Sequence, residues 1–261
     1  MGAKTVDTEI LAALVRLALA AGRKILDIAA EGFAVEHKAD SSPVTRADRA
    51  AEDIILAGLA RDVAAIPVIA EERMASEGAL ENPGPEFFLV DALDGTREFV
   101  AGRPDYTVNI ALVRAGAPVL GVVYAPERAV FWQGGPGGAS AARIDASGRA
   151  FDRRAIVSSA AQSPPRIVAS VSHRTPATDA FIAGHAGAPV LAIGSSLKFC
   201  LVAAGEADLY PRFGRTMEWD IAAGDAVLRA AGGMTRTLDG APLAYGKWPD
   251  FANPDFIAAA R

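Results

Sequence analysis

The sequence predicts a mixed α/β protein in which an α+β half is followed by an α/β half. Three observations lead to this prediction. Apolar residues recur at helical spacing over 7–30 and again over 44–59. Short continuous apolar runs then follow, and such runs are typical of strands buried on both faces. Beyond a stretch at 134–165 that is rich in Gly, Ala, Ser and Pro, candidate strands and helices alternate.

The first half, placed at residues 1–135, is expected to begin with two helices. Residues 7–30 form an amphipathic pattern, and a second helical pattern starts at Val44 and runs through Leu59. Apolar runs then predict strands at 66–70, 87–90, 106–113, 119–124 and 131–132. The glycine cluster at 134–138 is either a hairpin tip or a flexible surface loop.

The second half, placed at residues 136–261, follows a seam that we locate within 134–165. The pattern beyond the seam predicts strands at 167–171, 190–193 and 207–210. It predicts helices at 177–183, 195–204 and 221–231, the last of which ends at Gly232-Gly233. No fixed-period repeat is visible in the sequence.

Length and composition restrict the class of protein further. The chain has 261 residues, of which 51% are hydrophobic and 22% charged, which excludes a disordered or fibrous chain. The net charge of −5 disfavours a nucleic-acid polymer as partner. The single cysteine, Cys200, excludes an internal disulfide and is expected to be a buried core residue. We find neither a signal-peptide layout nor the ~20 consecutive apolar residues of a transmembrane helix, and expect a cytoplasmic protein.

Two of the apolar runs stop at a carboxylate. Residues 66–70 end at Glu71, and residues 87–90 end at Asp91. Acids at strand ends can converge on one edge of a sheet, and Asp94 follows in a tight turn. A helix after Thr96 would present free N–H groups as an anion site. Carboxylates beside an anion need cations between them, so the pattern predicts Mg²⁺ and a phosphoryl ligand.

Each of these pieces also has a plainer interpretation. Asp94-Gly95 is a common turn dipeptide, Glu71-Glu72 suits a solvated surface pair, and Asp220 suits a helix N-cap. His173 suits an exposed loop, and Lys198 suits a solvated helix face. Only the combination of the pieces favours a shared site.

Together these residues resemble the lithium-sensitive, Mg²⁺-dependent phosphatase superfamily that includes the inositol monophosphatases. Its hallmarks are Glu-Glu after a strand, Asp-Pro-(Ile/Leu)-Asp-Gly-Thr, and Trp-Asp-x-Ala-Ala-Gly. The chain carries, in that order and spacing, Ala70-Glu71-Glu72, Asp91-Ala92-Leu93-Asp94-Gly95-Thr96 and Trp219-Asp220-Ile221-Ala222-Ala223-Gly224. Ala92 departs from the usual proline, and the loss of a fixed φ is expected to loosen that turn.

Three further stretches are similar to one branch of this superfamily, the bacterial 3'(2'),5'-bisphosphate nucleotidases of sulfate assimilation. They are Lys38–Asp48, Thr96-Arg97-Glu98-Phe99, and Gly194–Cys200 followed by Asp208–Arg212. Inositol phosphatases usually have Thr-x-Asn-Phe at the second stretch, and more often lack the Lys and the Tyr-Pro-Arg of the third. The resemblance covers essentially the whole chain.

The resemblance implies a centre of two or three Mg²⁺ ions and a pair of residues that activate water. The metal ligands would be the carboxylates of Glu71, Asp91, Asp94 and Asp220 and the backbone carbonyl of Leu93. Thr96 would polarise the attacking water, with Asp48 orienting it as the proton acceptor. The water would attack phosphorus in line, without a covalent intermediate.

The same resemblance implies the substrate contacts. The N–H groups of Gly95 and Thr96 would hold the scissile phosphate, with Lys38 near it and near any third ion. Substrate would also lie against Glu71, Leu93, Asp94 and Asp220. Lys198 and Arg212, with Ser195 beside them, are the cationic candidates for a second phosphate, and His173 is expected near the nucleotide.

The fold that the resemblance implies is a layered α-β-α-β-α sandwich. Residues 1–135 would hold a largely antiparallel sheet and most metal ligands, and residues 136–261 would carry Asp220 and the nucleotide contacts. The implied activity is hydrolysis of the 3'-phosphate of adenosine 3',5'-bisphosphate to AMP and phosphate, with 3'-phosphoadenosine 5'-phosphosulfate as a further substrate. An inositol or other sugar-phosphate phosphatase and a catalytically silent nucleotide-binding scaffold are the alternatives. A homodimer and a peripheral position at the inner membrane are both compatible with the resemblance.

Overall fold

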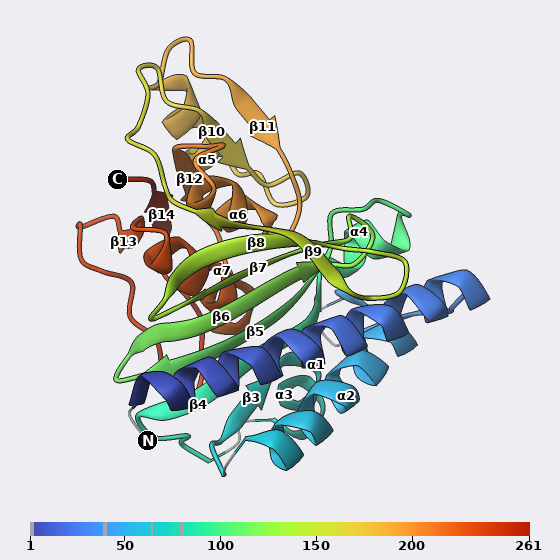
Figure 1. Cartoon of the computed structure of the whole chain (residues 1–261). Coiled ribbons are helices and arrows are strands. Elements are labelled where there is room, and N and C mark those ends of the chain that lie inside the picture. Colours follow the sequence, from blue (N-terminus) through green and yellow to red (C-terminus); the bar gives the residue numbers. More distant parts are fainter. Residues whose placement is uncertain (1–2, 39–40, 64, 79–80) are drawn as a thin grey trace.

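The structure is a computed structural model that describes residues 3–38, 41–63, 65–78 and 81–261 (Figure 1). Residues 39 and 40 of the Lys38–Asp48 stretch lie outside the described residues. The helices are α1 (Ala3–Glu31), α2 (Arg46–Asp62), α3 (Glu71–Glu77), α4 (Thr96–Val100), α5 (Pro176–Ala183), α6 (Leu197–Ala203) and α7 (Glu218–Ala230). The strands are β1 (Val35–His37), β2 (Pro43–Thr45), β3 (Val68–Ala70), β4 (Glu86–Asp94), β5 (Thr107–Arg114), β6 (Ala117–Ala125), β7 (Val130–Gly135), β8 (Gly138–Ile144), β9 (Ala150–Ile156), β10 (Ile167–Ala169), β11 (Val190–Ala192), β12 (Leu209–Arg212), β13 (Met234–Thr237) and β14 (Phe256–Ala259).

The elements are arranged in layers (Figure 1). Strands β3 to β9 form one sheet, here called the large sheet, and β10 to β14 form the small sheet. Helices α1 and α2 cover one face of the large sheet, while α7 packs on its other face together with α6. The small sheet packs against α6 and α7, and α5 contacts its strand β12. This is the layered α-β-α-β-α fold that was predicted.

Side chains of the central strands alternate between two cores. On β4, Phe88 and Val90 face the core shared with α1 and α2. Their neighbours Phe87 and Leu89 face the core shared with α6, α7 and the small sheet. A strand that is buried on both faces has no polar side, which explains why its sequence is a continuous apolar run.

The pairing of β3 with β4 places two acids at one edge of the large sheet. These strands are parallel, and Ala70 pairs with Val90, so Glu71 and Asp91 come next on neighbouring strands. Strands β4 to β9 pair antiparallel in chain order. The register between β4 and β5 shifts between Asp91 and Asp94, where the chain bends at the edge of the sheet.

The predicted boundary between residues 135 and 136 is wrong, because the large sheet continues past it. Gly135 pairs with Gly138 across the β7–β8 hairpin, so the glycine cluster is a hairpin tip. Strand β9 then extends the sheet to Ile156. The change from the large to the small sheet falls between Ile156 and Ile167, mostly within the predicted seam at 134–165. The exact boundary was misplaced because β9 is exposed over most of its length and therefore lacks the apolar run that marked the other strands.

The structure also bears on the start of the second helix, on Cys200 and on membrane-spanning helices. The second helix begins at Arg46, two residues later than the predicted Val44, because Pro43–Thr45 is strand β2 and Thr45 is the N-cap of α2. Cys200 is fully buried in the core between the two sheets, as predicted. Among the described helices, none has the length and apolar character needed to cross a membrane.

Candidate active site

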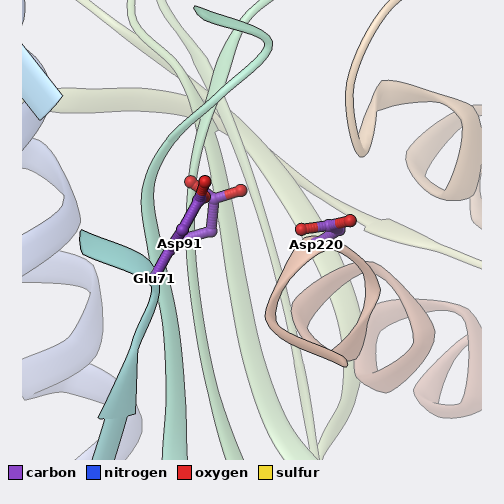
Figure 2. Close-up of side chains that lie close together, drawn as sticks. All are labelled: Glu71, Asp91 and Asp220. Carbon is purple, nitrogen blue, oxygen red and sulfur yellow. The ribbon is translucent and has the colours of Figure 1, made fainter. Parts of the chain in front are cut away.

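Three carboxylates converge where β3 and β4 reach the edge of the large sheet. Glu71 directly follows β3, and Asp91 lies beside it on β4 (Figure 2). Asp220 faces this pair from the first turn of α7 (Figure 2). One carboxylate oxygen from each residue lies within 4.8 Å of the other two. The convergence that was predicted from the strand ends is therefore confirmed for Glu71 and Asp91, and Asp220 joins them from α7.

The carboxylate of Asp220 is fixed by the start of its helix. Met217 is the N-cap residue of α7, and its backbone N–H donates to Asp220 Oδ2 at 2.8 Å. The plainer interpretation of Asp220 as the N-cap itself is therefore wrong, since it stands three residues further on. A carboxylate in the first turn also faces the positive end of the helix dipole.

These carboxylates are shielded from water and repel one another. Burial raises the pKa of Asp91 and Asp220 well above the ordinary value, and the charges of Glu71 and Asp94 raise both further. Burial likewise raises the pKa of Glu71, against the opposing charge of Lys38. A hard divalent cation bound between such oxygens would remove the repulsion, so this donor set fits Mg²⁺.

Asp94 lines the same region and is held by hydrogen bonds from the Ser195–Ser196 turn and from β5. Its Oδ2 accepts from Ser195 Oγ at 2.6 Å, from Ser196 N at 2.8 Å and from Asn109 Nδ2 at 3.4 Å. Ser195 has a φ of 55°, in the left-handed region that residues other than glycine rarely adopt. The turn at Ser195 and Ser196 thus brings two donors to one carboxylate oxygen.

The segment from Asp91 to Asp94 is restrained without the usual proline. Asp91 Oδ1 accepts the N–H of Leu93 at 3.1 Å. The carbonyl oxygen of Leu93 lies 3.2 Å from Thr96 Oγ1, and Ala92 is buried. These contacts limit the loosening that was expected from Ala92.

Thr96 and Asp48 are in direct contact, as predicted. Thr96 Oγ1 donates to Asp48 Oδ1 at 2.9 Å. Asp48 Oδ2 accepts from the N–H and the hydroxyl of Thr45 at 2.7 and 2.8 Å, which completes the capping box of α2. Gly95 precedes α4 with a φ of 92°, and a Cβ there would lie 3.0 Å from the carbonyl of Asp105, so this turn requires glycine.

A cavity of about 190 Å³ opens beside these residues. The predicted residues in its lining are Glu71, Asp94, Gly95, Thr96, His173, Ser195, Lys198, Arg212 and Asp220. Arg212 is buried and donates to the carbonyls of His173 at 3.3 Å and Arg215 at 2.9 Å. Its Nε has no hydrogen-bond partner within the described part of the chain. Burial, together with the charges of Arg212 and Arg97, lowers the pKa of His173, so its imidazole is neutral near pH 7.

The two predicted lysines are already engaged by the protein. Lys198 Nζ donates to the carbonyls of Ser195 at 2.6 Å and Ile193 at 3.3 Å, and burial lowers its pKa to about 8. Lys38 Nζ lies 2.6 Å from Glu71 Oε1 and 2.5 Å from Glu72 Oε1, and it lines a neighbouring cavity instead. Lys198 therefore stabilises the turn at Ser195, and Lys38 neutralises the carboxylates of Glu71 and Glu72.

Sequence reasoning assigned no role to three side chains at or near this site. Arg97 and Glu98 line the cavity, and Glu98 accepts the hydroxyl of Ser172. Both lie in the Thr-Arg-Glu-Phe stretch, which served only as a family signature. Glu52 is buried one helical turn after Asp48 on α2, and this i,i+4 spacing was the signal that could have identified it.

Comparisons with known proteins agree with this geometry. The sequence model of the inositol monophosphatase family matches residues 7–260. Among curated relatives is the 3'(2'),5'-bisphosphate nucleotidase CysQ of Escherichia coli O157:H7. It is 41% identical over 254 residues, which cover 92% of this chain and 96% of that protein.

Solved structures show the same fold. CysQ from Bacteroides thetaiotaomicron, described as a bacterial member of the inositol monophosphatase family, superposes with a TM-score of 0.80 at 37% identity and covers 96% of each chain. The inositol monophosphatase from Anabaena superposes with a TM-score of 0.73 at 26% identity, covering 96% of this chain and 90% of its own. From the family match over nearly the whole sequence and the shared layered fold, we conclude that this chain belongs to the inositol monophosphatase family.

Proposed function

We propose that this protein is a Mg²⁺-dependent phosphatase that hydrolyses the 3'-phosphate of adenosine 3',5'-bisphosphate to AMP and inorganic phosphate. The observation that carries the proposal is a single cavity lined by the acids Glu71, Asp94 and Asp220 and by the buried guanidinium of Arg212. A substrate with two phosphates needs both a cation site and a separate cationic side chain. The curated Escherichia coli relative bears the name of this activity. The proposal includes 3'-phosphoadenosine 5'-phosphosulfate, which carries the same 3'-phosphate.

The residues that would hold two or three Mg²⁺ ions are those that converge at the sheet edge and the bend beside it. They are the carboxylates of Glu71, Asp91, Asp94 and Asp220 and the carbonyl of Leu93. When bound, the ions would neutralise charge on the phosphate and stabilise the charge that develops on the leaving oxygen. Two observations support this assignment: the short distances among three of the carboxylates and their raised pKa values.

Thr96 and Asp48 would handle the proton of the attacking water. Because Thr96 Oγ1 donates its own hydrogen to Asp48, its lone pairs can accept a hydrogen bond from water. The buried Asp48 carboxylate is locked in place by Thr45, so the orientation of the Thr96 hydroxyl is set before substrate arrives. The N–H groups of Gly95 and Thr96 would bind oxygens of the scissile phosphate.

Arg212 is the side chain best placed to bind the second phosphate. Its Nε is an unsatisfied buried donor, and a buried donor without a partner is costly. A phosphate oxygen would satisfy it with a charge-assisted hydrogen bond. Lys198 would contribute through the Ser195 turn, and His173 would lie near the nucleotide as a neutral group.

Two other functions fit the site less well. An inositol or sugar-phosphate phosphatase would use the same acid cluster, but a monophosphate substrate has no second phosphate for Arg212 to bind. A catalytically silent scaffold would have no need of the buried, mutually repelling carboxylates, whose retention costs stability in the absence of a cation. A bisphosphate nucleotidase would use both the acid cluster, to bind cations, and Arg212, to bind the second phosphate.

Product analysis tests the proposal. The protein is incubated with Mg²⁺ and adenosine 3',5'-bisphosphate, and the nucleotide product is identified by chromatography against 5'-AMP and 3'-AMP standards. The proposal predicts 5'-AMP with one equivalent of phosphate, and no product from Asp91→Asn. A 3'-AMP product, or turnover that chelation leaves intact, would contradict it.

The proposal also sets a cellular role. The enzyme would act in the cytoplasm on a by-product of sulfate activation, and millimolar Li⁺ would inhibit it. The homodimer and the contact with the inner membrane stay predictions, because none of the described contacts bears on them.

A further inference from the structure

Glu52 is a buried acid whose hydrogen bonds reach a different helix. It lies on α2 with a side chain that is only 4% exposed. Its Oε2 accepts the backbone N–H of Glu72 at 2.8 Å, and its Oε1 accepts the N–H of Arg73 at 2.9 Å. Both carboxylate oxygens are therefore occupied by the first turn of α3.

Helix α3 depends on this contact because it has no cap of its own. The N-cap residue of α3 is Ala70, which has no side-chain oxygen to accept the first N–H groups of the helix. Glu52 supplies both acceptor oxygens from the neighbouring helix. The first residue of α3 is Glu71, so the backbone of this acid is fixed on one side by the pairing of β3 with β4 and on the other by Glu52.

The same face of α2 carries a second anchor. Asp48 precedes Glu52 by four residues, and residues at that spacing lie on one face of a helix. Asp48 accepts from Thr96 Oγ1, whereas Glu52 accepts from the residues that follow Glu71. One rigid helix thus sets the separation between the candidate water-activating hydroxyl and a candidate metal ligand.

We infer that Glu52 is a positioning residue that holds Glu71 in the geometry needed to bind a divalent cation. This inference rests on the metal centre of the proposed function, and Glu52 acts through the backbone of α3 without touching the ion. Loss of a group that orients a metal ligand typically lowers metal affinity by about 10–100-fold. A purely structural cap would lower the melting temperature and leave the metal affinity of the folded protein unchanged.

The test measures metal binding directly, without substrate. Mn²⁺ serves as the probe, and free Mn²⁺ is titrated by electron paramagnetic resonance in wild type, Glu52→Gln, Glu52→Ala and Asp53→Asn. Gln keeps one acceptor oxygen, so the first variant loses one of the two bonds and the second loses both. Asp53 is the adjacent exposed acid on α2 and controls for the loss of charge.

We expect Mn²⁺ affinity to fall by about 10-fold or more in Glu52→Ala and by a smaller factor in Glu52→Gln, with Asp53→Asn like wild type. The Mg²⁺ concentration for half-maximal phosphatase activity should rise in the same order, while kcat at saturating Mg²⁺ stays within about threefold. If Glu52→Ala does not fold, the Mn²⁺ affinity of Glu52→Gln tests the inference.

Unchanged Mn²⁺ affinity in the folded Glu52 variants would overturn the inference, and so would an equal loss in Asp53→Asn. Failure of the wild type to bind Mn²⁺ would remove the metal centre and this inference with it. If the protein binds Mn²⁺ but does not hydrolyse adenosine 3',5'-bisphosphate, only the proposed substrate is contradicted, and the inference about Glu52 stands.

Discussion

Replacing Thr96 by alanine is expected to lower kcat by about 10²-fold or more, because the hydroxyl that would accept a hydrogen bond from the attacking water and link it to Asp48 is lost. The Thr96 hydroxyl is held 2.9 Å from Asp48 Oδ1, and Asp48 is itself tied to Thr45. The backbone N–H of residue 96 remains in the variant, so phosphate binding is retained. KM should therefore stay within about threefold, since the lost interaction belongs to the transition state.

The same substitution should cost little stability. Asp48 keeps both hydrogen bonds on Oδ2, and water in the cavity beside residue 96 can replace the lost bond on Oδ1. The loss is then about 1 kcal/mol. For a chain of this length it lowers Tm by about 2–4 °C.

The assay is phosphate release from adenosine 3',5'-bisphosphate at saturating Mg²⁺, with Tm recorded for each variant. Thr96→Ser is the matched control, because it keeps the hydroxyl and should stay within about tenfold of wild type. The reasoning is refuted if Thr96→Ala turns over within about threefold of wild type, or if Thr96→Ser is as impaired as Thr96→Ala.

Three further predictions concern the acids and the second-phosphate subsite. Asp91→Asn should abolish Mg²⁺-dependent turnover and keep the fold, which circular dichroism checks. It should also raise the Tm of the metal-free protein at about pH 8, because the substitution removes a buried charge from among other acids; melting curves check this. Burial raises the pKa of Asp91 and Asp220, and raises that of Glu72 to about 7, so the folded metal-free protein holds more protons than the unfolded chain. Its Tm in chelator should therefore fall from about pH 5 to about pH 8, and Mg²⁺ should restore more at the higher pH; a Tm that rises over this window would contradict the assignment. Arg212→Gln should lower kcat/KM for adenosine 3',5'-bisphosphate by about 10–100-fold, and for 3'-AMP by less than about threefold, since 3'-AMP lacks the second phosphate; equal losses would argue against the subsite.

Much of the fold was predictable, because buried elements have clear sequence patterns. Strands β4 to β6 are buried on both faces and consist mostly of apolar residues, and α1 has a regular apolar stripe. Strand β9 is largely exposed, and β1 and β2 are short, so neither periodicity nor composition marked them. The boundary was misplaced for the same reason, since local composition carries no information about which strand joins which sheet.

The candidate site shows a similar division. Glu71 and Asp91 were predictable from strand ends, and Thr96 with Asp48 from the family motif. The roles of Lys198 and Lys38 were not, because a lysine that binds carbonyls or acids looks the same in sequence as one that binds phosphate. Which partner each lysine selects depends on tertiary contacts between segments far apart in the chain.

The most direct test of the central claim compares three substrates at equal concentration with Mg²⁺: adenosine 3',5'-bisphosphate, inositol 1-phosphate and fructose 1,6-bisphosphate. Initial rates of phosphate release give kcat/KM for each. The account predicts that the nucleotide exceeds the others by about 10²-fold, equivalent to about 2.7 kcal/mol of transition-state discrimination. A higher kcat/KM for inositol 1-phosphate would contradict the assignment of Arg212 to a second phosphate, while the acid cluster would retain its role in metal-dependent hydrolysis.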